Sequence, residues 1–216
     1  MKTMRVKLTT IAPMLGTAAA DPDIHGTYIA SNAPDALSME EEIAAVGVEE
    51  VIEKGMTIFP KVDGKPVMWP YQIRGFFKSA CSALSKIAKT ESSKLKAYKK
   101  QIDLRIFVFP DASDRSSRAI PIEFDGNIGD CQRPLRAQTA QGERVAIAHS
   151  ESIPAGATME FDIVMLNDDD EKLVTEWLDF GSLNGLGQWR NSGAGAFTWE
   201  KVSTTKPYSI SNLKAT

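Results

Sequence analysis

The sequence predicts an α+β fold, in which one antiparallel sheet carries two helices on one face and is interrupted by long insertions. Apolar and polar residues alternate over 4–10 and over 158–166, as they do in strands with one buried face. Apolar residues recur at helical spacing after Pro70 and after Asp168. Without the insertions the order is strand, helix, strand, strand, helix, strand, which is the order of a ferredoxin-like domain.

The first strand is predicted over residues 4–10 and leads into a long excursion. Its alternating pattern also argues against a signal peptide at the start of the chain. Residues 17–55 are rich in Ala, Asp, Pro and Ser, and a Ser-x-x-Glu pattern predicts a short helix over 38–46. We expect a single domain over 1–216, with insertions at about 17–55 and about 110–150.

A hairpin and the first helix are predicted next. Residues 56–59 and 66–69 flank an Asp-Gly pair at 63–64, which is typical of a tight hairpin turn. Pro70 suits the first position of a helix, and residues 86–101 form its lysine-rich tail. The predicted buried stripe of this helix consists of Ile73, Phe77, Ala80, Leu84 and Ile87.

The second half of the chain predicts further strands and a second helix. The strands are expected over 104–109, 119–124, 158–166 and 196–202, with an extended hairpin over 133–148. The helix begins at the acidic run 168–171 and ends at Gly181, which is a common helix terminator. Its buried face consists of Leu173, Val174, Trp177 and Leu178.

Positive charge is concentrated in the middle of the chain, although the formal net charge is −3. Residues 61–144 carry sixteen Lys or Arg and nine Asp or Glu, a balance of +7, and the rest of the chain carries −10. The basic middle is a candidate electrostatic footprint for nucleic acid. An ordinary helix and linker with solvated lysines explains the same charges.

The sequence lacks the motifs of several functional classes. Cys81 and Cys131 have neither metal-ligand nor disulfide spacing, which favours a reducing cytoplasm. The sequence holds no membrane-spanning apolar run, no Walker pattern, no nucleophile elbow and no zinc spacing. We therefore expect a cytoplasmic protein without a cofactor, a metal site or a membrane partner.

The glycine-rich stretch 185–195 is the main candidate site. Its glycines are Gly185, Gly187, Gly193 and Gly195. Glycine adopts positive φ readily and lets a phosphate approach the backbone N–H groups. Trp189 and Arg190 add a stacking surface and a guanidinium, which suit an unpaired base and its backbone. Composition alone also fits a plain glycine-rich loop before the last strand.

Further cations are candidates for phosphate binding. Arg74 and Lys78 lie one turn apart near the start of the first helix, where backbone N–H groups favour anions. Arg133 and Arg136 belong to the extended hairpin and add candidate contacts to nucleic acid. Alternatively, Arg74 and Lys78 only keep an exposed helix face soluble.

Four patches of the chain are similar to one family, in the order in which that family has them. They are Leu8–Gly16 (LTTIAPMLG), Trp69–Ser79 (WPYQIRGFFKS), Ile153–Phe161 (IPAGATMEF) and Gly185–Gly195 (GLGQWRNSGAG). They resemble the opening strand, the start of the first helix, a strand entry and the glycine-rich loop of the RAMP superfamily. These are RRM-like RNA-binding proteins of CRISPR effector complexes, which act in antiviral defence. The resemblance implies that the glycine loop and the first helix contact crRNA, as in repeating backbone subunits.

The leading hypothesis is binding of single-stranded nucleic acid, preferably RNA of the crRNA kind, by copies that assemble side by side along the strand. Its partners would be single-stranded RNA or DNA and copies of the same or related subunits. A stand-alone or phage-borne relative that handles single strands fits the residues too. A structural or protein-interaction component that uses the glycine loop only as a joint is the alternative from another class.

An endoribonuclease is the third hypothesis. The resemblance implies that an aspartate in the loop after the first strand can cut RNA, and Asp21, Asp23 and Asp35 lie in the comparable excursion. Beside prolines, such aspartates more commonly make turns. A metal-independent ribonuclease would need a general base, for which His25 and His149 are the histidines of this chain.

Overall fold

The computed structural model describes residues 1–19, 56–114, 117–139 and 142–202. The chain divides into two compact units. Unit 1 comprises Met1–Met14, Lys61–Gly126 and Pro154–Thr216, and unit 2 comprises Leu15–Pro60 and Asn127–Ile153. The organisation predicted from the sequence, a single domain with two insertions, stays a prediction.

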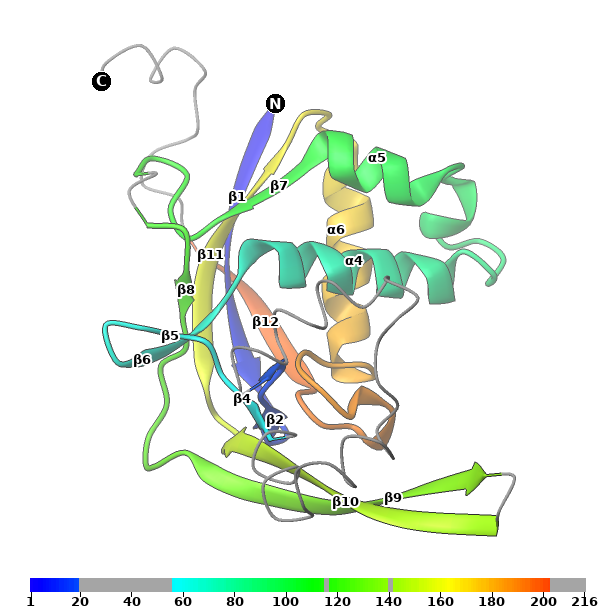
Figure 1. The fold of residues 1–216 in the computed structure, drawn as a ribbon. Helices are drawn as coiled ribbons and strands as arrows, with labels where there is room; N and C mark the ends of the chain where they lie inside the picture. The colour runs from blue at the N-terminus through cyan, green and yellow to red at the C-terminus, as the bar shows by residue number, and fades with distance from the viewer. Residues whose placement is uncertain (20–55, 115–116, 140–141, 203–216) are drawn as a thin grey trace, which may run out of the picture. The chain divides into compact units, whose positions relative to one another are not determined.

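Unit 1 contains a four-stranded antiparallel sheet with ferredoxin-like connectivity (Figure 1). Its strands are β1 (Lys2–Thr10), β7 (Ile106–Phe109), β11 (Thr158–Met165) and β12 (Phe197–Val202), which lie in the order β12-β1-β11-β7. Helix α4 (Pro70–Leu84) precedes β7, and helix α6 (Asp170–Asp179) precedes β12. The predicted α+β, ferredoxin-like fold is therefore confirmed.

The core of unit 1 lies between this sheet and its helices, which Figure 1 shows on one side of the sheet. Met4, Val6 and Leu8 of β1 are each at most 1% exposed, in keeping with the predicted alternation. Phe77 of α4 and Trp177 of α6 are fully buried, and their ring centroids lie 5.5 Å apart. Each such side chain contributes roughly 1.5–3 kcal/mol of burial free energy, so the two helices are fixed on the sheet.

The first helix is shorter than predicted. Helix α4 ends at Leu84, and Ile87 is 54% exposed instead of buried. The hydroxyl of Thr90 donates to the carbonyls of Leu84 and Ile87, which satisfies the helix end at this point. Beyond it, the Glu176 carboxylate accepts the backbone N–H groups of Glu91 and Ser92 and ties this turn to α6.

Residues 86–101 are consequently not a tail of the first helix. They contain the one-turn η1 (Ser92–Lys94) and enter a separate helix, α5 (Tyr98–Arg105). Because α5 includes Leu104 and Arg105, β7 begins at Ile106 and not at the predicted residue 104.

A small three-stranded sheet completes unit 1. It consists of β5 (Lys61–Val62), β6 (Lys65–Met68) and β8 (Ile120–Pro121). Asp63 and Gly64 have φ of 51° and 77°, which confirms the Asp-Gly turn, but the strand before it is 61–62 and not 56–59. The strand predicted over 119–124 shrinks to β8 and one bridge, because Pro121 has no N–H to donate.

Helix α6 confirms the second predicted helix, and a one-turn η2 (Phe180–Ser182) follows it. A Cβ at Gly181 would come within 2.2 Å of the Phe197 ring, so glycine is required there for packing. No helix in the described part of the chain is long and apolar enough to cross a bilayer.

Unit 2 is dominated by a long antiparallel ribbon of β9 (Gly129–Thr139) and β10 (Gly142–Ile153). This ribbon confirms the predicted extended hairpin and lengthens it at both ends. Among the described residues, the sheet that contains β10 also includes the short strands β2 (Met14–Leu15), β3 (Ala18–Ala19) and β4 (Thr57–Ile58). The helix predicted over 38–46 lies outside the described residues.

Candidate nucleic-acid interface

Two of the four loop glycines close the base of the glycine loop. A Cβ at Gly185 would lie 1.9 Å from the carbonyl carbon of Gly195, and a Cβ at Gly195 would lie 1.8 Å from the carbonyl oxygen of Leu186. The Leu186 N–H donates to the Gly195 carbonyl at 3.0 Å, and the Gly195 N–H donates to the Pro13 carbonyl at 2.8 Å. Gly185 and Gly195 are therefore glycines because two backbone segments cross there.

The tip of the loop has a different backbone. Gly187, Trp189 and Gly193 have φ of 84°, 56° and 89°, and the one-turn η3 (Arg190–Ser192) lies between the last two. The N–H groups of Leu186, Ser192, Gly193, Gly195 and Ala196 all donate to carbonyls of the protein. These five N–H groups are therefore occupied within the protein and do not form part of a phosphate cradle.

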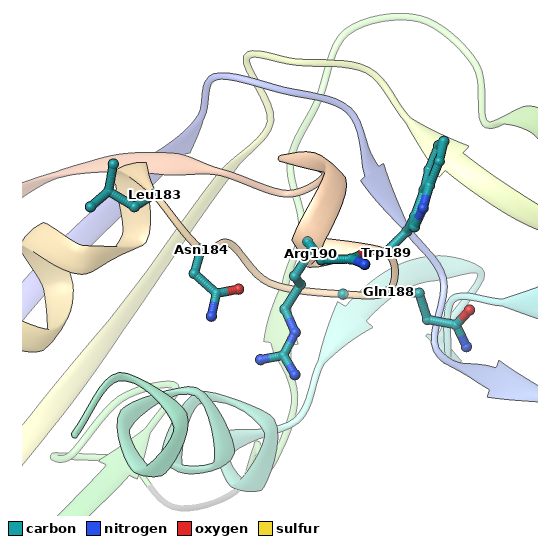
Figure 2. Close-up of a pocket in the computed structure, with 7 residues that line it drawn as sticks. Leu183, Asn184, Gln188, Trp189 and Arg190 are labelled. Atoms are coloured by element: carbon teal, nitrogen blue, oxygen red, sulfur yellow. The ribbon is translucent and has the colours of Figure 1, made fainter. Parts of the chain in front are cut away.

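The tip borders a hollow of about 530 Å³ in unit 1. We call it the loop hollow, and residues 183, 184 and 187–191 line it. Trp189 is 45% exposed there, although it is a large aromatic side chain. Figure 2 shows the Asn184 and Arg190 side chains on one side of the loop and the Trp189 ring on the other. A single-stranded nucleic acid that crosses this loop can thus contact a stacking surface on one side of the loop and a cation on the other.

Arg190 is a half-buried cation without a carboxylate beside it. Within the described ranges no Asp or Glu forms an ion pair with it, and it makes no other polar side-chain contact there. An arginine with five donors and no anion retains its full capacity for a phosphate. Of the predicted loop residues, the structure therefore brings Gly187, Trp189 and Arg190 together at one hollow.

The two predicted cations of the first helix are already paired. The Lys78 ammonium lies 2.7 Å from a carboxylate oxygen of Asp103 on α5, and the Arg74 guanidinium lies 3.9 Å from the same oxygen. Sequence reasoning missed Asp103, because it lies between the predicted lysine-rich tail, 86–101, and the strand predicted from residue 104. The helix spacing did place Arg74 and Lys78 on one face, and that face meets α5.

The predicted hairpin arginines belong to unit 2. Arg133 is 8% exposed and is opposite Ala148 in the ribbon, whereas Arg136 is opposite Val145. His149 lies in the same ribbon with its Nδ1 at 3.5 Å from an Asp130 carboxylate oxygen. That contact gives His149 a structural partner in its own ribbon.

The candidate nuclease residues Asp21, Asp23, Asp35 and His25 lie outside the described residues. The described residues also contain no group of three or more His, Cys, Asp or Glu that could hold a metal ion. Sequence reasoning also missed Asn184, whose side chain lies beside Arg190 in Figure 2. Its only sequence signal was its position directly before the first loop glycine.

Comparisons with known proteins find similarity among solved structures. No family model and no curated protein matches the chain. Among solved structures, it is similar to a chain in the cryo-EM structure of the type III-B Cmr-beta bound to cognate target RNA, with a TM-score of 0.48 and 13% sequence identity. The similarity covers 94% of this chain and 60% of that chain, so this chain spans less than two thirds of its neighbour's length.

Proposed function

We propose that this chain binds single-stranded nucleic acid, RNA by preference, at the loop hollow. The observation that carries the proposal is Arg190, a guanidinium with no ion-pair partner among the described residues, next to the 45% exposed Trp189. In this interaction Arg190 neutralises a phosphate and Trp189 stacks on a base, while the amides around Gly187 approach the sugar-phosphate backbone. Stacking on tryptophan is tolerant of sequence, so the binding is not base-specific.

We extend the proposal to a repeating subunit whose copies bind side by side along one strand, as a crRNA-like guide would require. Its support is the resemblance of four patches to the RAMP superfamily, in that family's order. The ribbon of unit 2 (129–153) is the proposed contact to the RNA strand or to a neighbouring copy, with the buried Arg133 supporting the ribbon from within. If saturated complexes on a long strand contain one copy in mass photometry, this extension is wrong.

The test is fluorescence anisotropy with labelled single-stranded RNA, single-stranded DNA and duplex of equal length, at about 50 and 200 mM salt. We expect salt-sensitive binding to the single strands and weaker binding to the duplex. The variant R190A should bind about 5- to 10-fold more weakly, and its salt slope should fall by about 0.7, which is the contribution of one phosphate contact on a single strand.

A matched control is K100A, which removes an exposed positive charge from α5 outside the loop hollow. K100A should behave like the wild type apart from a small long-range effect. Equal losses in R190A and K100A would show that only net charge matters and would remove Arg190 from the site. No binding by the wild type at low salt would favour the structural or protein-interaction alternative.

A further inference from the structure

A second hollow of unit 1, about 730 Å³ in volume, lies where β7 ends and α4 begins. We call it the helix-start hollow. Val108, Phe109 and Pro110 form an apolar wall, and Trp69 and Tyr71 flank the first helical residue, Pro70. Pockets of about 300–1,000 Å³ hold small organic ligands, so the volume suits one nucleotide.

Tyr71 is an exposed aromatic residue at this hollow. Its side chain is 62% exposed, whereas Ile73, two residues further along α4, is 1% exposed. Ile73 anchors the helix in the core, and Tyr71 presents a flat aromatic surface to solvent at a fixed helical position. A rigidly placed aromatic ring stacks on a base with little loss of conformational entropy.

Two guanidinium groups border the same hollow. Arg118 is exposed, and among the residues that the structure describes it has no hydrogen-bond or ion-pair partner. Arg74 lies 3.9 Å from the Asp103 carboxylate, at the outer limit of an ion pair, whereas Lys78 holds that carboxylate at 2.7 Å. Lys78 therefore supplies the close partner of Asp103, and Arg74 is left close enough to the hollow to meet an anion.

We infer that the helix-start hollow is a second nucleotide subsite, in which Tyr71 stacks on a base while Arg118 and Arg74 bind the adjacent phosphate of the same single strand. The inference rests on the proposed function, because it names where a second nucleotide of that strand binds. The combination of an exposed aromatic ring, an apolar wall and two guanidiniums matches a nucleotide in both its base and its phosphate.

The test separates stacking from charge in the full-length protein. Y71A should weaken binding of a single-stranded RNA of about 20 nucleotides by about 5- to 100-fold and leave the salt slope unchanged, because it removes a stacking contact. Y71F should bind like the wild type, because the ring remains. R118A should weaken binding and lower the salt slope by about 0.7, and R118K should restore most of the slope.

A direct readout is photo-cross-linking with RNA that carries 5-iodouridine, followed by mass spectrometry of the peptides. We expect cross-links at Tyr71 as well as at Trp189, and loss of the Tyr71 cross-link when that residue is Ala. The fold-loss of affinity in the double variant R118A/R190A should equal the product of the fold-losses in the two single variants, since independent contacts add in free energy.

The outcomes also separate this inference from the proposed function. If the wild type binds single strands and R190A weakens binding, but Y71A and R118A match K100A and cross-links occur only at Trp189, the second subsite is wrong and the proposed function stands. If the wild type binds no single strand at all, both are wrong. Circular dichroism of each variant confirms that the exposed substitutions leave the fold intact.

Discussion

The first helix and the glycine loop carry cations of the same kind in different electrostatic situations. Lys78 and Arg74 of α4 share the carboxylate of Asp103, whereas no described carboxylate pairs with Arg190. Lys78, which lies 2.7 Å from Asp103, must leave this partner before it can bind a phosphate, whereas Arg190 need not leave one. The comparison teaches that the availability of a charge depends on the helix packed against it, which a count of lysines and arginines does not reveal.

The sharpest way to test the loop side of this comparison is to distort the loop base. G195A should lower the free energy of unfolding by about 2–4 kcal/mol, because a Cβ at φ +69° would overlap the Leu186 carbonyl oxygen at 1.8 Å. It should also reduce RNA binding through the displaced tip. Urea unfolding and anisotropy measure the two effects.

G193A is the matched control at the tip. Gly193 also has a positive φ, +89°, but a Cβ there would meet no atom within 4 Å. Its expected cost is about 1 kcal/mol of backbone strain, without a steric overlap. Equal losses in the two variants would contradict the assignment of Gly195 to a backbone crossing.

The helix side of the comparison is tested by removing the carboxylate. D103N should release Arg74 and Lys78, raise the affinity for single-stranded RNA about two- to fivefold and steepen the salt slope by up to about 0.7 per released cation. The loss in stability should stay below about 1 kcal/mol, since Asp103 is 47% exposed. An unchanged affinity in anisotropy would mean that these cations do not face the strand.

The smallest effect on stability is expected at Glu171, whose paired charge supports the fold and lies outside the candidate site. Hydrogen bonds from Lys2 and Lys201 hold the pKa of the Glu171 carboxyl below its ordinary value of 4.5. A carboxyl with a lowered folded-state pKa stabilises the protein above pH 4.5, and this stabilisation is lost as the pH falls through the folded-state pKa. E171Q should therefore be slightly less stable than the wild type at pH 7, by less than about 1 kcal/mol.

Urea unfolding of both proteins from pH 7 to pH 3 measures this difference. The difference in unfolding free energy between the wild type and E171Q should become smaller below about pH 4.5, where protonation removes the Glu171 charge from the wild type too. RNA binding at pH 7 should be unchanged in E171Q. If the stability difference between the two proteins instead grows on acidification, the pKa of Glu171 is not lowered in the folded state.

The fold was predictable because its core obeys simple periodicities. The alternation of Met4, Val6 and Leu8 and the helical spacing of Ile73 and Phe77 reflect burial against one layer, and each of these residues is at most 1% exposed. The limits of the first helix were not predictable, because a hydroxyl from Thr90 and a carboxylate from the distant α6 decide them. Periodicity carries no information about such partners.

The candidate site was predictable only in part. The glycines marked the loop, but the sequence did not separate Gly185 and Gly195, which pack against other backbone, from Gly187 at the tip. The pairing of Arg74 and Lys78 with Asp103 depends on how α5 packs on α4. The helix-start hollow needs β7 beside the first turn of α4, and strand and helix patterns do not determine that placement.

The backbone crossing at Gly185 and Gly195 has a consequence for engineering. The Leu186 amide donates to the Gly195 carbonyl and the Gly195 amide donates to the Pro13 carbonyl, so backbone hydrogen bonds close the loop base three residues beyond the end of β1. Residues 188–191 lie between the two ends of this closed base, and we expect short replacements of the segment to leave the base closed. A library of variants confined to residues 188–191 should therefore change what the loop recognises and leave the fold of unit 1 intact.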